Sequence, residues 1–291
     1  MSADSGKTDR AEVALRSRKK KYADERRHMV IDFHAHAFLD ALAAGAVASL
    51  GKRANLTPFT DGTVSGTERC MREQGVDRFV VLNIAVNPRT ERHVNDFAIS
   101  LYKNPNIIPF GSVHPDSEHA FEELKRLKEA GIKGIKFHHE YQNFYADDEK
   151  AYPIYEKCAE MGFIMLYHGG ADRGFTTPVK ASPERIRRVW KAFPQAKIIA
   201  AHLGGQDMTE QAIESLLDTG VYIDTSFAAL SVPMEQGKKV IRAFGSERVL
   251  FGSDCPWDTP ANTLHYLQSM ELTEKEMEDI CSRNALRLLG E

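Results

Sequence analysis

Short apolar runs recur at regular spacing along most of the chain. Eight of them are rich in β-branched and aromatic residues, as buried strands are, and they cover residues 29–34, 78–83, 107–113, 132–137, 163–168, 197–202, 221–224 and 248–252. Successive runs begin about 31 residues apart, which is the size of one strand–helix unit. The pattern therefore predicts eight strands joined by long connections.

Helical patterns occupy several of these connections. Residues 186–193 have apolar side chains at i, i+3, i+4 and i+7, and Phe121, Leu124 and Leu127 form a similar stripe behind Asp116, the expected helix cap. Four connections end in glycine directly before a strand, where a left-handed residue often follows a helix, at positions 75, 131, 162 and 220. The chain is therefore predicted to alternate helix, turn and strand.

Eight strand–helix units in about 264 residues fit an α/β fold of the (β/α)8 TIM-barrel type, as a single domain over residues 28–291. A doubly wound open sheet has the same alternation and remains the alternative. The first connection is the longest, at residues 38–65. In a barrel it would lie on the face where active sites are built, so we expect either a lid or a surface loop.

Composition and charge narrow the class of protein. The chain has 291 residues, of which 42% are hydrophobic and 27% charged, and its net charge is −3. This charge gives no electrostatic reason to bind nucleic acid. No apolar run approaches the roughly 18 residues that cross a bilayer, and no apolar segment follows the N-terminal charges. We expect a cytoplasmic enzyme with a small-molecule substrate and no nucleic-acid or membrane partner.

Residues 1–27 differ from the rest of the chain. They contain nine basic and five acidic residues and therefore carry +4, which leaves −7 on the remainder. With few large apolar side chains, this basic segment is predicted to be a flexible arm, either a solvated tail or a contact between subunits. A homo-oligomer is therefore possible. The four cysteines are far apart and form no CxxC pair, which predicts reduced thiols, three of them in the core.

The candidate chemistry lies at the ends of the predicted strands. Asp254 follows the eighth strand, and seven of the eleven histidines end or follow the earlier ones: His34, His36, His114, His138, His139, His168 and His202. A barrel brings all these ends to one pocket. His34 and His36 alternate along a strand, so both can point to one side and chelate a cation such as zinc. His168 and Asp254 are the best remaining ligands.

Five segments that contain these residues resemble the amidohydrolase-related metal-dependent hydrolases, which are TIM barrels of the amidohydrolase superfamily. The segments are residues 31–36, 131–138, 168–170, 201–205 and 251–257. The resemblance extends from about residue 29 to the C-terminus and leaves the basic arm outside. It implies that His34, His36 and His168 bind a divalent metal, usually zinc, with Asp254 beside or on it. It also implies that His202 orients water or polarises the substrate.

These residue types predict hydrolysis of a C–N or C–O bond by a metal-activated water. Asp254 would take the proton of the water and pass it to the leaving group, while His202 would stabilise the developing negative charge. The same resemblance implies an alternative, nonoxidative decarboxylation of an aromatic or muconate-type acid. A nuclease is disfavoured because the barrel portion is negative. A non-enzymatic scaffold is a further alternative, in which the metal site would have no turnover.

Lys136 lies where binuclear members of the superfamily place a carboxylated lysine between two metals. It could instead remain an ammonium that pairs with a substrate carboxylate, with His138 on the same strand face. We favour a single metal, most simply Zn²⁺, although such sites also accept Mn, Fe, Co or Ni. Arg173 and Trp257 complete the predicted substrate-binding set, and His114 and His139 are expected to lie behind the site or at the surface.

Overall fold

The computed structural model describes residues 29–176 and 178–291, and the basic arm lies outside this range. In the described chain, all eight predicted strands are confirmed, each shorter than the apolar run that predicted it. They are β1 (Ile31–Ala35), β2 (Arg78–Leu82), β3 (Ile107–Phe110), β4 (Gly134–Phe137), β5 (Ile164–Tyr167), β6 (Lys197–Ala200), β7 (Tyr222–Asp224) and β8 (Val249–Leu250). Neighbouring strands are parallel and follow the order of the sequence.

Hydrogen bonds join the strands into a ring. The regular ladders form two sheets, β1-β2-β3 and β4-β5-β6-β7-β8. At one seam, the backbone N–H of Lys136 donates to the carbonyl of Gly111 over 2.8 Å. At the other, the N–H of Phe33 donates to the carbonyl of Phe251 over 2.7 Å. The chain therefore has the TIM-barrel architecture rather than the doubly wound open sheet.

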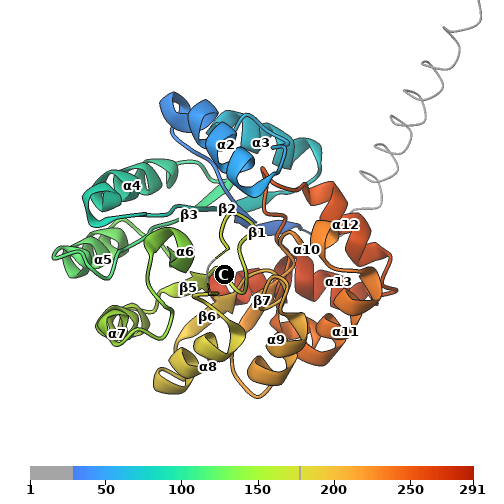
Figure 1. Cartoon of the computed structure of the whole chain (residues 1–291). Coiled ribbons are helices and arrows are strands. Elements are labelled where there is room, and N and C mark those ends of the chain that lie inside the picture. Colours follow the sequence, from blue (N-terminus) through green and yellow to red (C-terminus); the bar gives the residue numbers. More distant parts are fainter. Residues whose placement is uncertain (1–28, 177) are drawn as a thin grey trace, which may run out of the picture.

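Helices surround the strands (Figure 1). The outer helices are α2 (Asp40–Ala54), α3 (Val64–Glu73), α4 (Pro88–Leu101), α5 (Ala120–Glu129), α7 (Tyr152–Glu160), α8 (Pro183–Ala192), α9 (Thr209–Leu216), α11 (Met234–Phe244), α12 (Pro260–Gln268) and α13 (Glu274–Glu278). Shorter turns are α6 (His139–Gln142), η1 (Glu149–Ala151), α10 (Ala228–Ser231), η2 (Ser246–Arg248), η3 (Asp279–Arg283) and α14 (Asn284–Leu289). No helix of the described chain is long and apolar enough to span a membrane.

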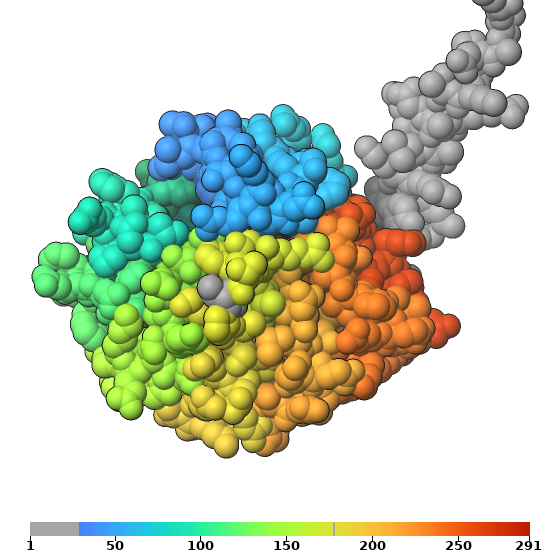
Figure 2. Space-filling view, viewed as in Figure 1, coloured from blue at the N-terminus to red at the C-terminus, as the bar shows by residue number. Residues whose placement is uncertain are grey.

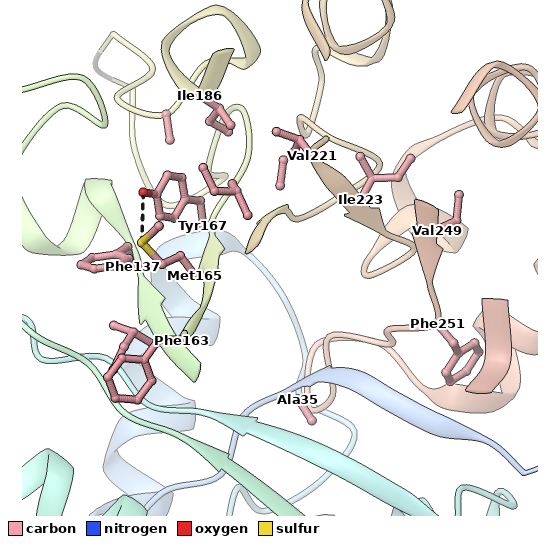
Figure 3. Close-up of a cluster of buried hydrophobic side chains, with 14 of the residues drawn as sticks. Ala35, Phe137, Phe163, Met165, Tyr167, Ile186, Val221, Ile223, Val249 and Phe251 are labelled. Carbon is pink, nitrogen blue, oxygen red and sulfur yellow. Dashed lines mark hydrogen bonds between the residues drawn. The ribbon is translucent and has the colours of Figure 1, made fainter. Parts of the chain in front are cut away.

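Strand alternation divides the apolar core into two layers. An inner cluster fills the barrel and includes Phe33, Phe110 and Leu166. An outer cluster lies between strands and helices, and Figure 3 shows part of it, including the hydroxyl of Tyr167 that donates to the sulfur of Met165 over 3.8 Å. Helix α14 packs against the inner cluster, so it closes the end of the barrel opposite the strand-end histidines.

The expected helix cap at Asp116 is wrong. Helix α5 begins at Ala120, and Asp116 instead pairs with Lys150 over 2.7 Å. The buried stripe of α5 contains Ala120, Leu124 and Leu127, whereas Phe121 is 49% exposed. Leu124 and Leu127 are therefore buried as predicted, and the small Ala120 takes the place expected for Phe121.

Three of the four glycines expected to be left-handed are so. Gly75, Gly131 and Gly162 have φ values of 86°, 87° and 71°, but Gly220 is not among the residues with positive φ. The chain before Gly220 turns differently, because the hydroxyl of Thr219 donates to the carbonyl of Leu216 over 2.6 Å and ends the helix there. The cysteine prediction is confirmed in part: Cys158, Cys255 and Cys281 are buried free thiols.

Candidate active site

A cavity of about 870 Å³ opens at the carboxyl ends of the strands. Asp254 lines it together with five of the seven strand-end histidines: His34, His36, His138, His168 and His202. The other two, His114 and His139, do not line it, in agreement with their expected place behind the site. His114 is buried with its Nε2 3.0 Å from the carbonyl of Gln142, and His139 packs against Phe144. His139 directly follows His138, so the chain directs the two side chains to different sides.

His34, His36 and Asp254 form the clearest candidate metal centre. The Nε2 atoms of His34 and His36 lie 3.4 and 3.3 Å from Oδ1 of Asp254. All three donor atoms lie within 4.8 Å of one another. Two imidazole nitrogens and a carboxylate oxygen are donors that zinc, manganese and iron accept. The three side chains therefore fit a divalent cation between them.

The hydrogen bonds behind these rings orient their lone pairs toward the cavity. Nδ1 of His34 donates to Oδ2 of Asp224 over 2.8 Å, and Nδ1 of His36 donates to the carbonyl of Leu82 over 3.1 Å. A proton on Nδ1 leaves the Nε2 lone pair free for a metal. Burial, and next the charge of Lys136, lowers the pKa of His34 to about 3, so this ring is neutral at neutral pH.

Sequence reasoning missed Asp224. It is the last residue of β7 and completely buried. Burial alone would raise its pKa, but the contacts with His34, His202 and Ser226 hold the pKa well below its ordinary value. The sequence feature that could have identified Asp224 is a carboxylate at the end of a predicted strand, which is the feature that identified Asp254.

Asp254 is fixed by the seam between β8 and β1. Its backbone N–H donates to the carbonyl of His34 over 2.8 Å, and its φ of 69° is left-handed, a conformation that aspartate tolerates better than most residues. Oδ1 of Asp32 accepts the backbone N–H groups of His34 and Ser253, each over 3.0 Å. Burial would raise the pKa of Asp254, but His36, His34 and His202 bring it to about 2, so it is a carboxylate at neutral pH.

His168 lines the same cavity as the other predicted ligands, but it is not in their group of donor atoms. Its Nδ1 lies 3.0 Å from Nε2 of His202, so one ring donates a hydrogen bond to the other. His168 instead belongs to a second group of donor atoms with His138 and Asp172. Asp172, which sequence reasoning also missed, lies in the loop after β5 and brings its carboxylate to 3.3 Å from Nε2 of His138.

The loop after β5 is held by close backbone packing. A Cβ at Gly170, which has φ of 79°, would lie 2.3 Å from the backbone nitrogen of Gln206 in the next loop. The guanidinium of Arg53, at the end of α2, lies 5.3 Å from the ring centre of Phe175 and 5.7 Å from that of Tyr141. The yellow segment of this loop therefore lies against the blue α2 region in Figure 2. Part of the insertion at residues 38–65 thus borders the cavity.

All four predicted substrate-binding residues line the cavity: Lys136, His138, Arg173 and Trp257. Lys136 is fully buried, and its Nζ makes no hydrogen bond with any described residue. Burial lowers the pKa of Lys136 to about 8, although the carboxylates of Asp224 and Asp254 oppose the shift. The guanidinium of Arg173 lies 4.9 Å from the ring centre of Phe227. The cavity lining therefore contains two cationic side chains, the buried Lys136 and the exposed Arg173.

The sequence profile of the amidohydrolase family matches residues 31–290, and the chain belongs to this family. No curated protein matches it. Its fold is similar to that of an uncharacterized TIM-barrel protein from Bordetella bronchiseptica, with 19% identity over 90% of this chain and 98% of that chain and a TM-score of 0.71.

Two further solved structures share the fold but are named for different reactions. A 5-carboxyvanillate decarboxylase from Novosphingobium aromaticivorans, complexed with manganese, has 16% identity over 92% of this chain and 97% of that chain, with a TM-score of 0.69. A probable 2-pyrone-4,6-dicarboxylic acid hydrolase from Acinetobacter baumannii has 16% identity over 90% and 99%, with a TM-score of 0.66. These likenesses establish the fold and leave the reaction open.

Proposed function

We propose that the protein is a metal-dependent hydrolase that cleaves a C–N or C–O bond of a small organic substrate. The observation that carries the proposal is the convergence of His34, His36 and Asp254 at the inner end of an open cavity. When bound there, a divalent cation would polarise the substrate and lower the pKa of water. Membership of the amidohydrolase family supports this chemistry.

The side chains around the centre have complementary roles in the proposal. Asp254 accepts a proton from the attacking water and later delivers it to the leaving group. His202, whose Nδ1 lies 2.9 Å from the hydroxyl of Ser226, stabilises the oxygen on which negative charge develops. His168 is the candidate fourth ligand that the family resemblance implies, and binding a metal through its Nδ1 would require the contact of that atom with Nε2 of His202 to open.

Lys136 supports an anionic group on the substrate. The charges of Asp224 and Asp254 act on Lys136, but its Nζ makes no hydrogen bond with a described residue, and a buried ammonium without an acceptor is costly. A substrate carboxylate would supply the missing acceptor. In the alternative, a carboxylated Lys136 bridges two metals, and the protein would then bind two equivalents of metal. We expect one metal per chain.

Decarboxylation is the second candidate, and Lys136 supports it through binding. A substrate carboxylate would be held and oriented by the buried ammonium. The solved structures of similar fold include proteins named as decarboxylases of ring carboxylic acids and one named as a hydrolase of such an acid. In this reaction Asp254, a carboxylate at neutral pH, would first take a proton from water or from a hydroxyl of the substrate and then deliver it to the carbon from which CO₂ leaves.

One experiment distinguishes the two reactions. The full-length protein is stripped of metal, reloaded with Mn²⁺ or Zn²⁺, and incubated with esters, lactones, amides and hydroxybenzoates while acid release and CO₂ release are both measured. We expect metal-dependent acid release that Asp254→Asn abolishes, whereas Asp279→Asn, a buried aspartate at η3, retains it. Metal-dependent CO₂ release without acid release would overturn the hydrolase proposal.

Metal titration tests the ligand set separately from turnover. His34→Asn and His36→Asn should both abolish tight Mn²⁺ binding, and His168→Asn should weaken it if His168 is the fourth ligand. His114→Asn, which changes a buried histidine outside the cavity, is the matched control. Unchanged affinity in His36→Asn would refute the proposed centre.

A further inference from the structure

The cavity extends well beyond the candidate metal centre. Its outer part lies between α2 and α4, and we call it the α2–α4 groove. The groove is lined by Leu39, Leu42, Leu50 and Leu56 on one side and by Val94 and Phe97 on the other. This apolar wall is continuous with the polar inner end, because one cavity contains both.

The apolar side chains of the groove are not required for packing α2 against the barrel. Helix α2 buries a different face, which contains Ala43, Val47 and Gly51. Leu39 and Leu42, by contrast, are 45% and 61% exposed. A contiguous exposed apolar surface at the mouth of a cavity is typical of a binding site.

The size of the cavity exceeds the needs of a one-ring acid. A cavity of about 150 Å³ is enough for benzene, whereas this one measures about 870 Å³. The volume therefore leaves room for a long apolar group beside the part of the substrate that reacts.

Charge is distributed unevenly along the cavity. The metal-centre carboxylate and Lys136 are buried at the inner end, whereas Arg173 is an exposed side chain that also lines the cavity. At the outer end, Asp96 is already paired with Arg126 over 2.7 Å, and His93 is the other ionisable side chain of that wall. The cavity thus suits a ligand that is polar at one end and apolar at the other.

We propose that the α2–α4 groove binds an extended alkyl or acyl chain of the substrate, whose polar end lies at the candidate metal centre. The inference rests on the proposed function for the identity of the reacting end. It makes Leu42 and its neighbours determinants of specificity, and it predicts that the substrate is an amphipathic acid derivative rather than a single-ring compound.

Binding of straight-chain acids tests the groove without requiring turnover. Butanoic, hexanoic, octanoic and decanoic acids are titrated into the Mn²⁺-loaded full-length protein by calorimetry. Each methylene that becomes buried should lower Kd by about two- to fourfold, because burial of a methylene contributes about 0.8 kcal/mol at most. The gain should end where the chain leaves the groove.

Leu42→Asp should remove most of this chain-length dependence while the affinity for butanoic acid stays unchanged. Aspartate is tolerated in the first turn of a helix, so the variant should fold. Leu230→Asp is the matched control, because Leu230 is a 45% exposed leucine of α10 that does not line the cavity. It should leave the whole series unchanged.

Three results would overturn the proposal. The first is a Kd that does not depend on chain length, and the second is an equal effect of Leu42→Asp and Leu230→Asp. The third is a dimer that Leu42→Asp dissociates, because this would show that a second copy of the chain covers the groove. The proposed function fails separately. If affinity depends on chain length but no metal-dependent hydrolysis is found, the groove proposal stands and the hydrolase proposal is rejected. If short substrates are hydrolysed but Kd does not depend on chain length, the hydrolase proposal stands and the groove proposal is rejected.

Discussion

Asp224→Asn should weaken metal binding although Asp224 itself contacts no metal. Oδ1 of Asp224 accepts the backbone N–H groups of His202 and Ser226 over 3.0 and 3.1 Å. In the variant these two donors hold the amide oxygen at the same position, so the amide NH₂ faces Nδ1 of His34. That NH₂ can only donate, and His34 must then carry its proton on Nε2, where the metal would bind.

The expected magnitude follows from this change of tautomer. Replacing a hydrogen-bond partner behind a metal ligand costs about 10- to 100-fold in metal affinity, or about 1.4–2.7 kcal/mol. Titration of the metal-free protein with Mn²⁺, followed by calorimetry, measures the loss directly. Circular dichroism and thermal unfolding of the metal-free variant show whether it has folded.

Asp279→Asn is the control, because Asp279 is also a buried aspartate and accepts hydrogen bonds from Ser246 and Lys275 at η3. It should bind Mn²⁺ as the unmodified protein does. If folded Asp224→Asn binds Mn²⁺ with unchanged affinity, the tautomer argument is refuted, and with it the assignment of His34 Nε2 as a ligand.

Three further predictions concern metal removal, pH and packing. Chelation should abolish turnover, and restoring metal at a hundred times its Kd should add about 2.7 kcal/mol to the free energy of unfolding; identical thermal unfolding with and without metal would contradict this. Folding lowers the pKa of Lys136 from 10.5 to about 8. Between pH 8 and pH 10.5 the unfolded chain therefore binds more protons than the folded protein does. The free energy of unfolding of the metal-free protein should rise by about 3 kcal/mol across this pH range. Lys136→Met should lack this gain and be more stable at pH 7, so parallel stability curves for the two proteins would refute it. Gly134→Ala should cost about 1–3 kcal/mol, because its Cβ would lie 2.2 Å from the ring of Phe110. Gly45→Ala, with no atom within 4 Å of its Cβ in α2, should instead stabilise by about 0.5–1 kcal/mol, and denaturant unfolding compares the two.

The strands could be read from the chain because they are buried on both faces. Parallel strands inside a barrel need apolar side chains toward the interior and toward the helices, so they appear as continuous apolar runs. The same regularity made the strand-end residues recognisable, since each run ends at the face where sites are built. His34, His36 and Asp254 are local features of this kind, and their convergence was expected before the fold was known.

Relations between side chains from different strands could not be read in the same way. Asp224 behind His34, and the loop that brings Asp172 to His138, depend on distances between segments far apart in the sequence. The place of His139 behind the site was predicted, and the structure adds the reason, because His139 is the first residue of α6. The stripe that α5 buries was misassigned at one position because both Ala120 and Phe121 are apolar.

The sequence by itself therefore determined the order of strands and helices, the family, and the side chains that meet at the open end of the barrel. The tertiary structure alone decided which of those side chains share a site, which hydrogen-bond partner orients each ring, and that an apolar groove extends from the centre between α2 and α4. The physical reason is that periodicity records the burial of each element along the chain. Donor geometry and cavity shape depend instead on how separate elements are positioned against one another.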